Sequence, residues 1–175
     1  AQSLETIAAA AEILRNENIH WVFLGDGRRR DWLQNTVTDQ QLDDKVHILG
    51  RRPMESMPAY FSLADVMLVT LKDDSVMATT IPGKVQSYLA CNKPIIGALN
   101  GAGASIIDDS QAGYSVASGD VQGLADAVLR MSRLNKLERH AMGQSARYYY
   151  EQNFDRDKLI EQLELWMSDS HGMNQ

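Results

Sequence analysis

Short apolar runs of strand length alternate along this chain with longer segments in which apolar residues recur every three or four positions. The short runs favour strands and the longer segments favour amphipathic helices. Nearly continuous apolar strands are typical of a parallel sheet with helices on both faces, so we predict an α/β fold with a doubly wound, Rossmann-like parallel sheet and a helical C-terminal extension. The predicted strands are 20–24, 46–49, 66–71, 94–99 and 114–117, and the main predicted helices are 4–14, 53–64, 83–91, 104–110, 119–131, 136–151 and 155–168.

Composition indicates a globular protein and argues against several functions. The 175 residues suffice for one domain, residues 1–175, and 44% hydrophobic with 23% charged residues is typical of folded chains. The net charge of -6 argues against nucleic acid as a partner, because a general nucleic-acid binder needs a cationic surface. One cysteine, Cys91, fits a reducing compartment, and no apolar run approaches the roughly 20 residues that span a bilayer. We therefore expect a cytoplasmic protein.

Glycine-rich turns follow several of the predicted strands. Ligands of an open parallel sheet bind at the carboxyl ends of its strands, and glycine lets a ligand approach the backbone closely. The site is therefore expected at Gly25-Asp26-Gly27, Gly50-Arg51-Arg52, the loop 72–84 and Asn100-Gly101-Ala102-Gly103.

Pro82-Gly83-Lys84 begins the predicted helix 83–91 with an unexpected charge. Proline suits a helix start, because the N–H that it lacks has no partner within the helix there. Lys84 adds positive charge where the helix dipole is already positive, which is unfavourable for stability alone. The arrangement favours a bound anion, most simply a phosphate, and the alternative is a lysine that points into solvent.

Five motifs follow one another along the chain: VFLGDG (22–27), VHILGR (46–51), AYFSLADVMLVTL (59–71), IPGKVQSYLACNKPIIG (81–97) and AGYSVASGDVQGLADAVLRM (112–131). In this order they resemble the C-terminal, donor-binding domain of a family 4 (group 1) glycosyltransferase of the GT-B fold. The resemblance covers essentially the whole chain and is to a branch with a Pro-x-Lys motif.

The resemblance implies a larger, two-domain protein. A strand that precedes helix 4–14, and an upstream acceptor-binding domain, are both expected in this family and are not within these residues. That strand would be central in the sheet order 3-2-1-4-5-6. We therefore expect that another segment fills its place, that a neighbouring chain contributes, or that strands 19–24 and 66–71 pair directly.

The resemblance also implies roles for named residues. Many family members have two glutamates at the positions of Thr79 and Ser87, and their absence leaves the nucleotide and sugar open. No catalytic residue, cofactor or metal is assigned, and the adjacent Asp73 and Asp74 are read as solvated acids. The expected donor contacts are Gly25 and Gly27 across the cleft, Arg51 at the base or ribose, Thr79, Thr80 and Ile81 at the sugar and distal phosphate, Pro82 and Lys84 at the diphosphate, and Ser87 at the ribose.

The implied activity is transfer of a sugar from a nucleotide diphosphate sugar, with a UDP-sugar favoured, to a glycan or lipid-linked acceptor in bacterial surface polysaccharide synthesis. Retention of anomeric configuration, location at the inner membrane surface and a homodimer are further expectations, and this chain alone should be inactive. A dinucleotide-binding oxidoreductase, supported by Gly101-Ala102-Gly103, and a sugar-nucleotide epimerase of the same architecture are the alternatives. The least specific alternative is a structural interaction module.

Overall fold

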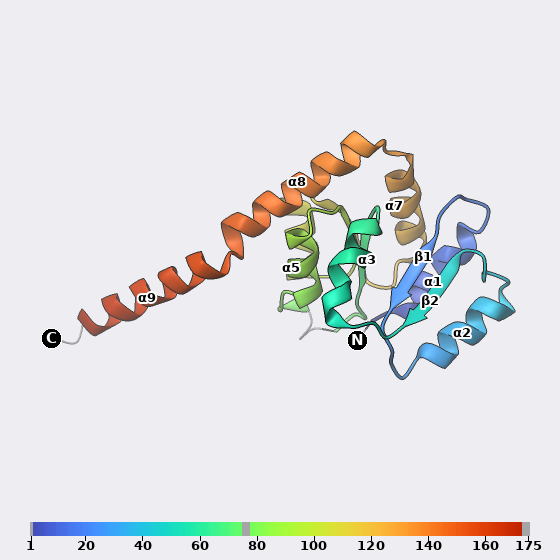
Figure 1. Cartoon of the computed structure of the whole chain (residues 1–175), viewed down its shortest axis with the longest axis horizontal. Coiled ribbons are helices and arrows are strands. Elements are labelled where there is room, and N and C mark those ends of the chain that lie inside the picture. Colours follow the sequence, from blue (N-terminus) through green and yellow to red (C-terminus); the bar gives the residue numbers. More distant parts are fainter. Residues whose placement is uncertain (1, 75–77, 173–175) are drawn as a thin grey trace.

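The structure, a computed structural model, describes residues 2–74 and 78–172 and has the predicted alternation of strands and helices (Figure 1). The strands are β1 (Trp21–Leu24), β2 (Val46–Gly50), β3 (Met67–Thr70), β4 (Ile95–Ala98) and β5 (Gly113–Val116). The helices are α1 (Leu4–Ile13), α2 (Arg30–Asp39), the 3₁₀ turn η1 (Met54–Ser56), α3 (Met57–Leu63), α5 (Gly83–Ala90), α6 (Ala102–Asp109), α7 (Val121–Arg133), α8 (Lys136–Asn153) and α9 (Arg156–Gly172).

The strands form two parallel sheets rather than one. β1 pairs with β2, and the other sheet has the order β3-β4-β5. Within the described residues no ladder joins the two sheets, so direct pairing of strands 19–24 and 66–71 is wrong. The residues before α1 approach β3 instead, since the Thr70 hydroxyl donates a hydrogen bond to the Ser3 carbonyl at 3.4 Å. The other two expectations for the missing strand stay predictions.

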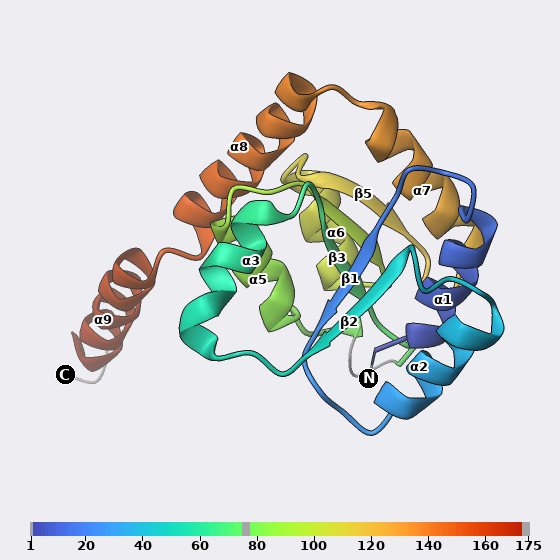
Figure 2. The same ribbon diagram turned by 45° about the vertical axis from the view of Figure 1, so that its right-hand side comes forward.

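Helices cover both faces of the β3-β4-β5 sheet, as predicted (Figure 2). Consecutive residues of β4 point to opposite faces of the sheet. Ile96 packs in the core that includes α1 and α7, whereas Ile95 packs in the core that includes α5 and α6. A Cβ at Gly97 would lie only 2.5 Å from the Ile107 side chain of α6. This glycine therefore lets α6 pack directly on β4.

The chain ends in two long helices, of which the second leaves the body of the domain (Figure 1). α8 begins with a capping box in which the Asn135 side chain accepts from the N–H of Glu138, and the Glu138 carboxylate accepts from the Asn135 N–H. None of the helices in the described ranges is long and apolar enough to cross a bilayer. α9 exposes a series of large apolar side chains: Leu159, Ile160, Leu163, Leu165, Trp166 and Met167.

Candidate functional site

The turns after β1 and β2 lie side by side at the carboxyl ends of these strands. The N–H of Gly25 donates to the carbonyl of Gly50 at 2.8 Å. Both glycines have positive φ, 125° and 68°, which other residues rarely adopt. A Cβ at Gly25 or Gly27 would meet no atom within 4 Å, and Arg51 is exposed beside them. The structure thus brings these predicted residues together at one open edge.

The N-terminus of α5 has no side-chain cap among the described residues. Pro82 is the N-cap residue, has the extended conformation (φ -63°, ψ 130°) and makes no side-chain capping hydrogen bond. Gly83 is exposed, and a Cβ built on it would meet nothing within 4 Å. The first intrahelical hydrogen bond runs from Val85 N–H to the Pro82 carbonyl at 2.9 Å. The N–H groups of Gly83 and Lys84 precede this bond and have no partner within the helix, as is general for the first turn of a helix.

Lys84 lies in this first turn and is exposed. Within residues 2–74 and 78–172, no carboxylate forms an ion pair with it. Although solvent reaches the side chain, neighbouring protein atoms remove part of its hydration, which lowers the pKa of Lys84 below its ordinary value of 10.5. The charged amine is consequently less stable than in water and gains from an anion nearby.

The other predicted residues of this region flank the α5 N-terminus. Thr79, Thr80 and Ile81 are exposed immediately before Pro82. The Ser87 hydroxyl donates to the Gly83 carbonyl at 2.9 Å, one turn earlier in the helix. Its proton is therefore used within the helix, while the lone pairs of its oxygen are left to accept a further hydrogen bond.

The Gly101-Ala102-Gly103 turn contacts protein rather than open space. A Cβ at Gly101 would lie 2.0 Å from the Ala78 carbonyl oxygen, and one at Gly103 would lie 3.0 Å from Pro82. These glycines let the segment before α5 pack against the start of α6. That packing removes the basis for the oxidoreductase alternative, in which the same glycines would approach a pyrophosphate.

Asn100 was predicted only as a residue of a turn, but its side chain connects the ends of three strands. Its Nδ2 donates to Asp73 Oδ1 at 2.9 Å, and its Oδ1 accepts from the Ser118 N–H at 3.0 Å. The Ser118 hydroxyl in turn donates to the Leu71 carbonyl. Asp73 is thus held by an amide, and the described residues include no group of three ligands suited to a metal. An asparagine directly after a buried strand was the signal that could have identified this connection.

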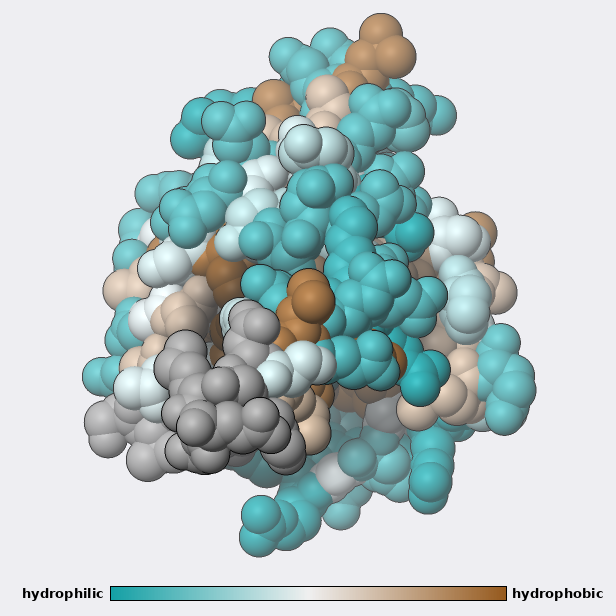
Figure 3. Space-filling model, turned by 90° about the vertical axis from the view of Figure 1, so that its left-hand side faces the viewer, coloured by the Kyte–Doolittle hydropathy of each residue, from teal (hydrophilic) through white to brown (hydrophobic). Residues whose placement is uncertain are grey.

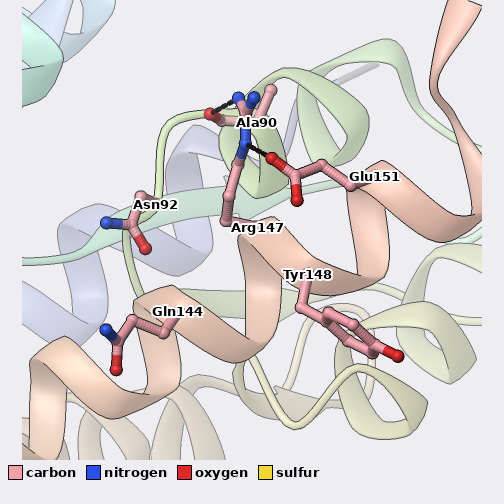
Figure 4. A pocket seen from close by; sticks show the side chains of 6 residues that line it. All are labelled: Ala90, Asn92, Gln144, Arg147, Tyr148 and Glu151. Atoms are coloured by element: carbon pink, nitrogen blue, oxygen red, sulfur yellow. Dashed lines mark hydrogen bonds and ion pairs between the residues drawn. The ribbon is translucent and has the colours of Figure 1, made fainter.

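A hollow of about 390 Å³ lies at the opposite, C-terminal end of α5, where α8 crosses it (Figure 4). Arg147 donates to the Ala90 carbonyl at 2.9 Å and to Glu151 at 2.7 Å. A Cβ at Gly143 would lie 2.4 Å from the Asn92 carbonyl oxygen, so this glycine sets the close approach of α8. These contacts place a cation at the negative end of α5, which stabilises the helix.

Residues 2–133 match the family model described as "Glycosyl transferases group 1". The probable glycosyltransferase WbjE of Pseudomonas aeruginosa is 27% identical over 164 residues, which cover 93% of this chain and 40% of WbjE. The amylovoran biosynthesis glycosyltransferase AmsK of Erwinia amylovora is 26% identical over 129 residues, 71% of this chain and 31% of AmsK. A crystal structure of Anabaena Alr3699/HepE in complex with UDP has the same fold, with a TM-score of 0.82 and 17% identity over 96% of this chain and 45% of HepE. This chain spans less than half the length of these proteins.

Proposed function

Because the chain belongs to the group 1 glycosyltransferases, we propose that the ends of its strands bind the diphosphate of a nucleotide sugar. The observation that carries the proposal is the N-terminus of α5, which is uncapped and open and carries Lys84. The fold agrees with that of HepE, a protein whose structure contains UDP. The oxidoreductase and epimerase alternatives have no comparable support.

In this proposal each predicted residue has a position that suits its role. The N–H groups of Gly83 and Lys84, with the Lys84 amine, hold the diphosphate and stabilise the charge that develops on it as the sugar leaves. Thr79, Thr80 and Ile81 face the sugar from the segment before Pro82, and the Ser87 oxygen accepts from the ribose. Across the cleft, Arg51 contacts the base beside the open Gly25 and Gly27.

The reaction that we propose is transfer of a sugar, with a UDP-sugar favoured as donor and with retention of configuration, to a glycan or lipid-linked acceptor of bacterial surface polysaccharide. The name of AmsK, an amylovoran biosynthesis glycosyltransferase, supports this acceptor class. The chain spans less than half of its relatives, and we propose that the acceptor site lies outside it and that this chain by itself binds donor without transferring sugar.

α9 supplies a surface for that other part. Its apolar side chains are exposed, with Leu163 at 53% and Trp166 at 62%. Burial of exposed apolar side chains is favourable in water, so we propose that a further domain or a second copy covers α9. On the face from which α9 projects, the apolar surface otherwise forms small separate patches among polar side chains (Figure 3).

Replacement of Leu163 by alanine in this chain should change the free energy of unfolding by less than about 0.5 kcal/mol, because the side chain is already exposed. The matched control is Leu124→Ala in α7, whose side chain is fully buried at 0% exposure, and we expect it to cost about 2–5 kcal/mol. Urea denaturation measures the free energy of unfolding of both variants, and light scattering shows whether each sample is a monomer or a dimer. A large loss of stability for Leu163→Ala in a dimeric sample would instead show that a second copy covers α9.

Binding of UDP to this chain should weaken as the pH rises through the lowered pKa of Lys84, where an ordinary lysine is still charged. Desolvation lowers the pKa of Lys84, and a bound diphosphate favours its charged form, so a proton is taken up on binding. Isothermal calorimetry with UDP and GDP at several pH values measures this. The Lys84→Arg variant, whose guanidinium stays charged, should show only the titration of the nucleotide itself. Absence of binding of either nucleotide at pH 7 would overturn the proposed function.

A further inference from the structure

An ion cluster joins the two sheets at the edge where the proposed donor site lies. Glu5, in the first turn of α1, accepts from Arg29 in the turn after β1, and its Oε1 lies 3.5 Å from the Nζ of Lys72 after β3. We call these three residues the Glu5 cluster. β1 and β3 belong to separate sheets, so the cluster connects strand ends that no backbone ladder connects within the described residues.

The two cations of the Glu5 cluster are held differently. The Arg29 guanidinium also lies over the ring of Trp32, 4.1 Å from its centroid, which fixes its position. Lys72 has Glu5 as its partner, at a distance that is long for a charged pair, and its side chain is 53% exposed. Exposed ion pairs contribute about 1 kcal/mol or less to stability. Lys72 is therefore the cation that exchanges partners readily.

The Glu5 carboxylate keeps its negative charge, and one of its two oxygens has no hydrogen-bond partner among the described residues. Its own backbone N–H, followed by the Arg29 guanidinium, holds the pKa of the Glu5 carboxyl below its usual range. Both cations contact the same oxygen, Oε1, while Oε2 is buried and has no hydrogen-bond partner among the described residues. The cluster thus carries one net positive charge that Glu5 does not neutralise.

Lys72 is also anchored at the ligand edge by its neighbour in the chain. Asp73 accepts from Asn100, which links the ends of β3, β4 and β5. A nucleoside diphosphate carries at least two negative charges near pH 7, and Lys84 neutralises one of them. A second cation on the same edge of the sheet complements the remaining charge.

We propose that Lys72 is a second phosphate-binding residue of the donor site and that Glu5 is a positioning residue, which holds the Lys72 amine until the diphosphate displaces it. This inference rests on the proposed function. The exchange is purely electrostatic: the Lys72 amine leaves a carboxylate oxygen and contacts a phosphate oxygen, with no bond broken.

Calorimetric titration of UDP, with uridine as a probe without phosphate, tests the proposal. Lys72→Gln should lower the affinity for UDP about tenfold, the loss of one charged hydrogen bond, and leave the affinity for uridine unchanged. Lys72→Arg should restore most of the loss. Glu5→Gln should raise the affinity for UDP about threefold by removing the competing carboxylate, and this gain should vanish in the Glu5→Gln/Lys72→Gln double variant.

The outcomes separate this inference from the proposed function. Equal affinity of wild type and Lys72→Gln for UDP, in a chain where Lys84→Ala loses affinity, would overturn the role of Lys72 alone. Absence of UDP binding to the wild-type chain would overturn both. A gain for Glu5→Gln that persists without Lys72 would assign the effect of Glu5 to general repulsion and overturn its positioning role. Thermal unfolding of each variant verifies that it is folded.

Discussion

Replacement of Lys84 by alanine should lower the affinity of this chain for UDP about ten- to a hundredfold, because a charged hydrogen bond to a phosphate contributes about 1.5–3 kcal/mol. The same change should leave the free energy of unfolding unchanged or raise it by up to about 1 kcal/mol. Lys84 stands at the positive end of α5, where no capping side chain offsets its charge. Calorimetry and urea denaturation of the same samples measure the two effects separately.

A loss of affinity without a loss of stability makes the Lys84 prediction specific. If Lys84 served stability instead, its removal would lower both the affinity for UDP and the free energy of unfolding. Lys136, at the start of α8, is also an exposed lysine near a helix N-terminus, and it serves as the matched control. Lys136→Ala should not alter UDP affinity. Equal affinity of wild type and Lys84→Ala would refute the phosphate site at α5.

Replacement of Gly113 by alanine should destabilise the domain by about 3 kcal/mol or more. Gly113 is the first residue of β5 and pairs with Ile95 of β4. A Cβ at this position would lie 1.8 Å from the Ile95 carbonyl oxygen, so β4 and β5 would have to separate. The contact atom belongs to the backbone, and no side-chain rotation relieves it. Urea denaturation monitored by circular dichroism gives the change.

Gly27→Ala is the control for the Gly113 prediction. A Cβ at Gly27 meets nothing within 4 Å, and the backbone there does not have the positive φ that excludes other residues. We expect a change within about 1 kcal/mol, with a gain in stability if alanine mainly restricts the unfolded chain. A loss at Gly27 as large as that at Gly113 would contradict the geometric explanation.

Much of the fold and part of the site could be predicted from the chain alone. The spacing of apolar residues located the strands and helices, since each period reflects local geometry that distant residues do not alter. The helix 53–64 was less accurate, because it begins as the 3₁₀ turn η1 and continues as the shorter α3. Glycine turns and Pro82-Gly83-Lys84 indicated the edge of the sheet at which the proposed site lies, because that edge follows from strand direction.

The sequence by itself therefore determined the order of elements, the family and the charge at the start of α5. Only the tertiary structure decided that the sheet is divided between β1 and β3, and that Glu5 joins Arg29 to Lys72 across the division. The reason is physical: a helix or strand is favoured by neighbours within a few residues, whereas these contacts join residues far apart in the chain. Contacts between distant residues depend on how all the layers pack together, and the local sequence pattern does not predict them.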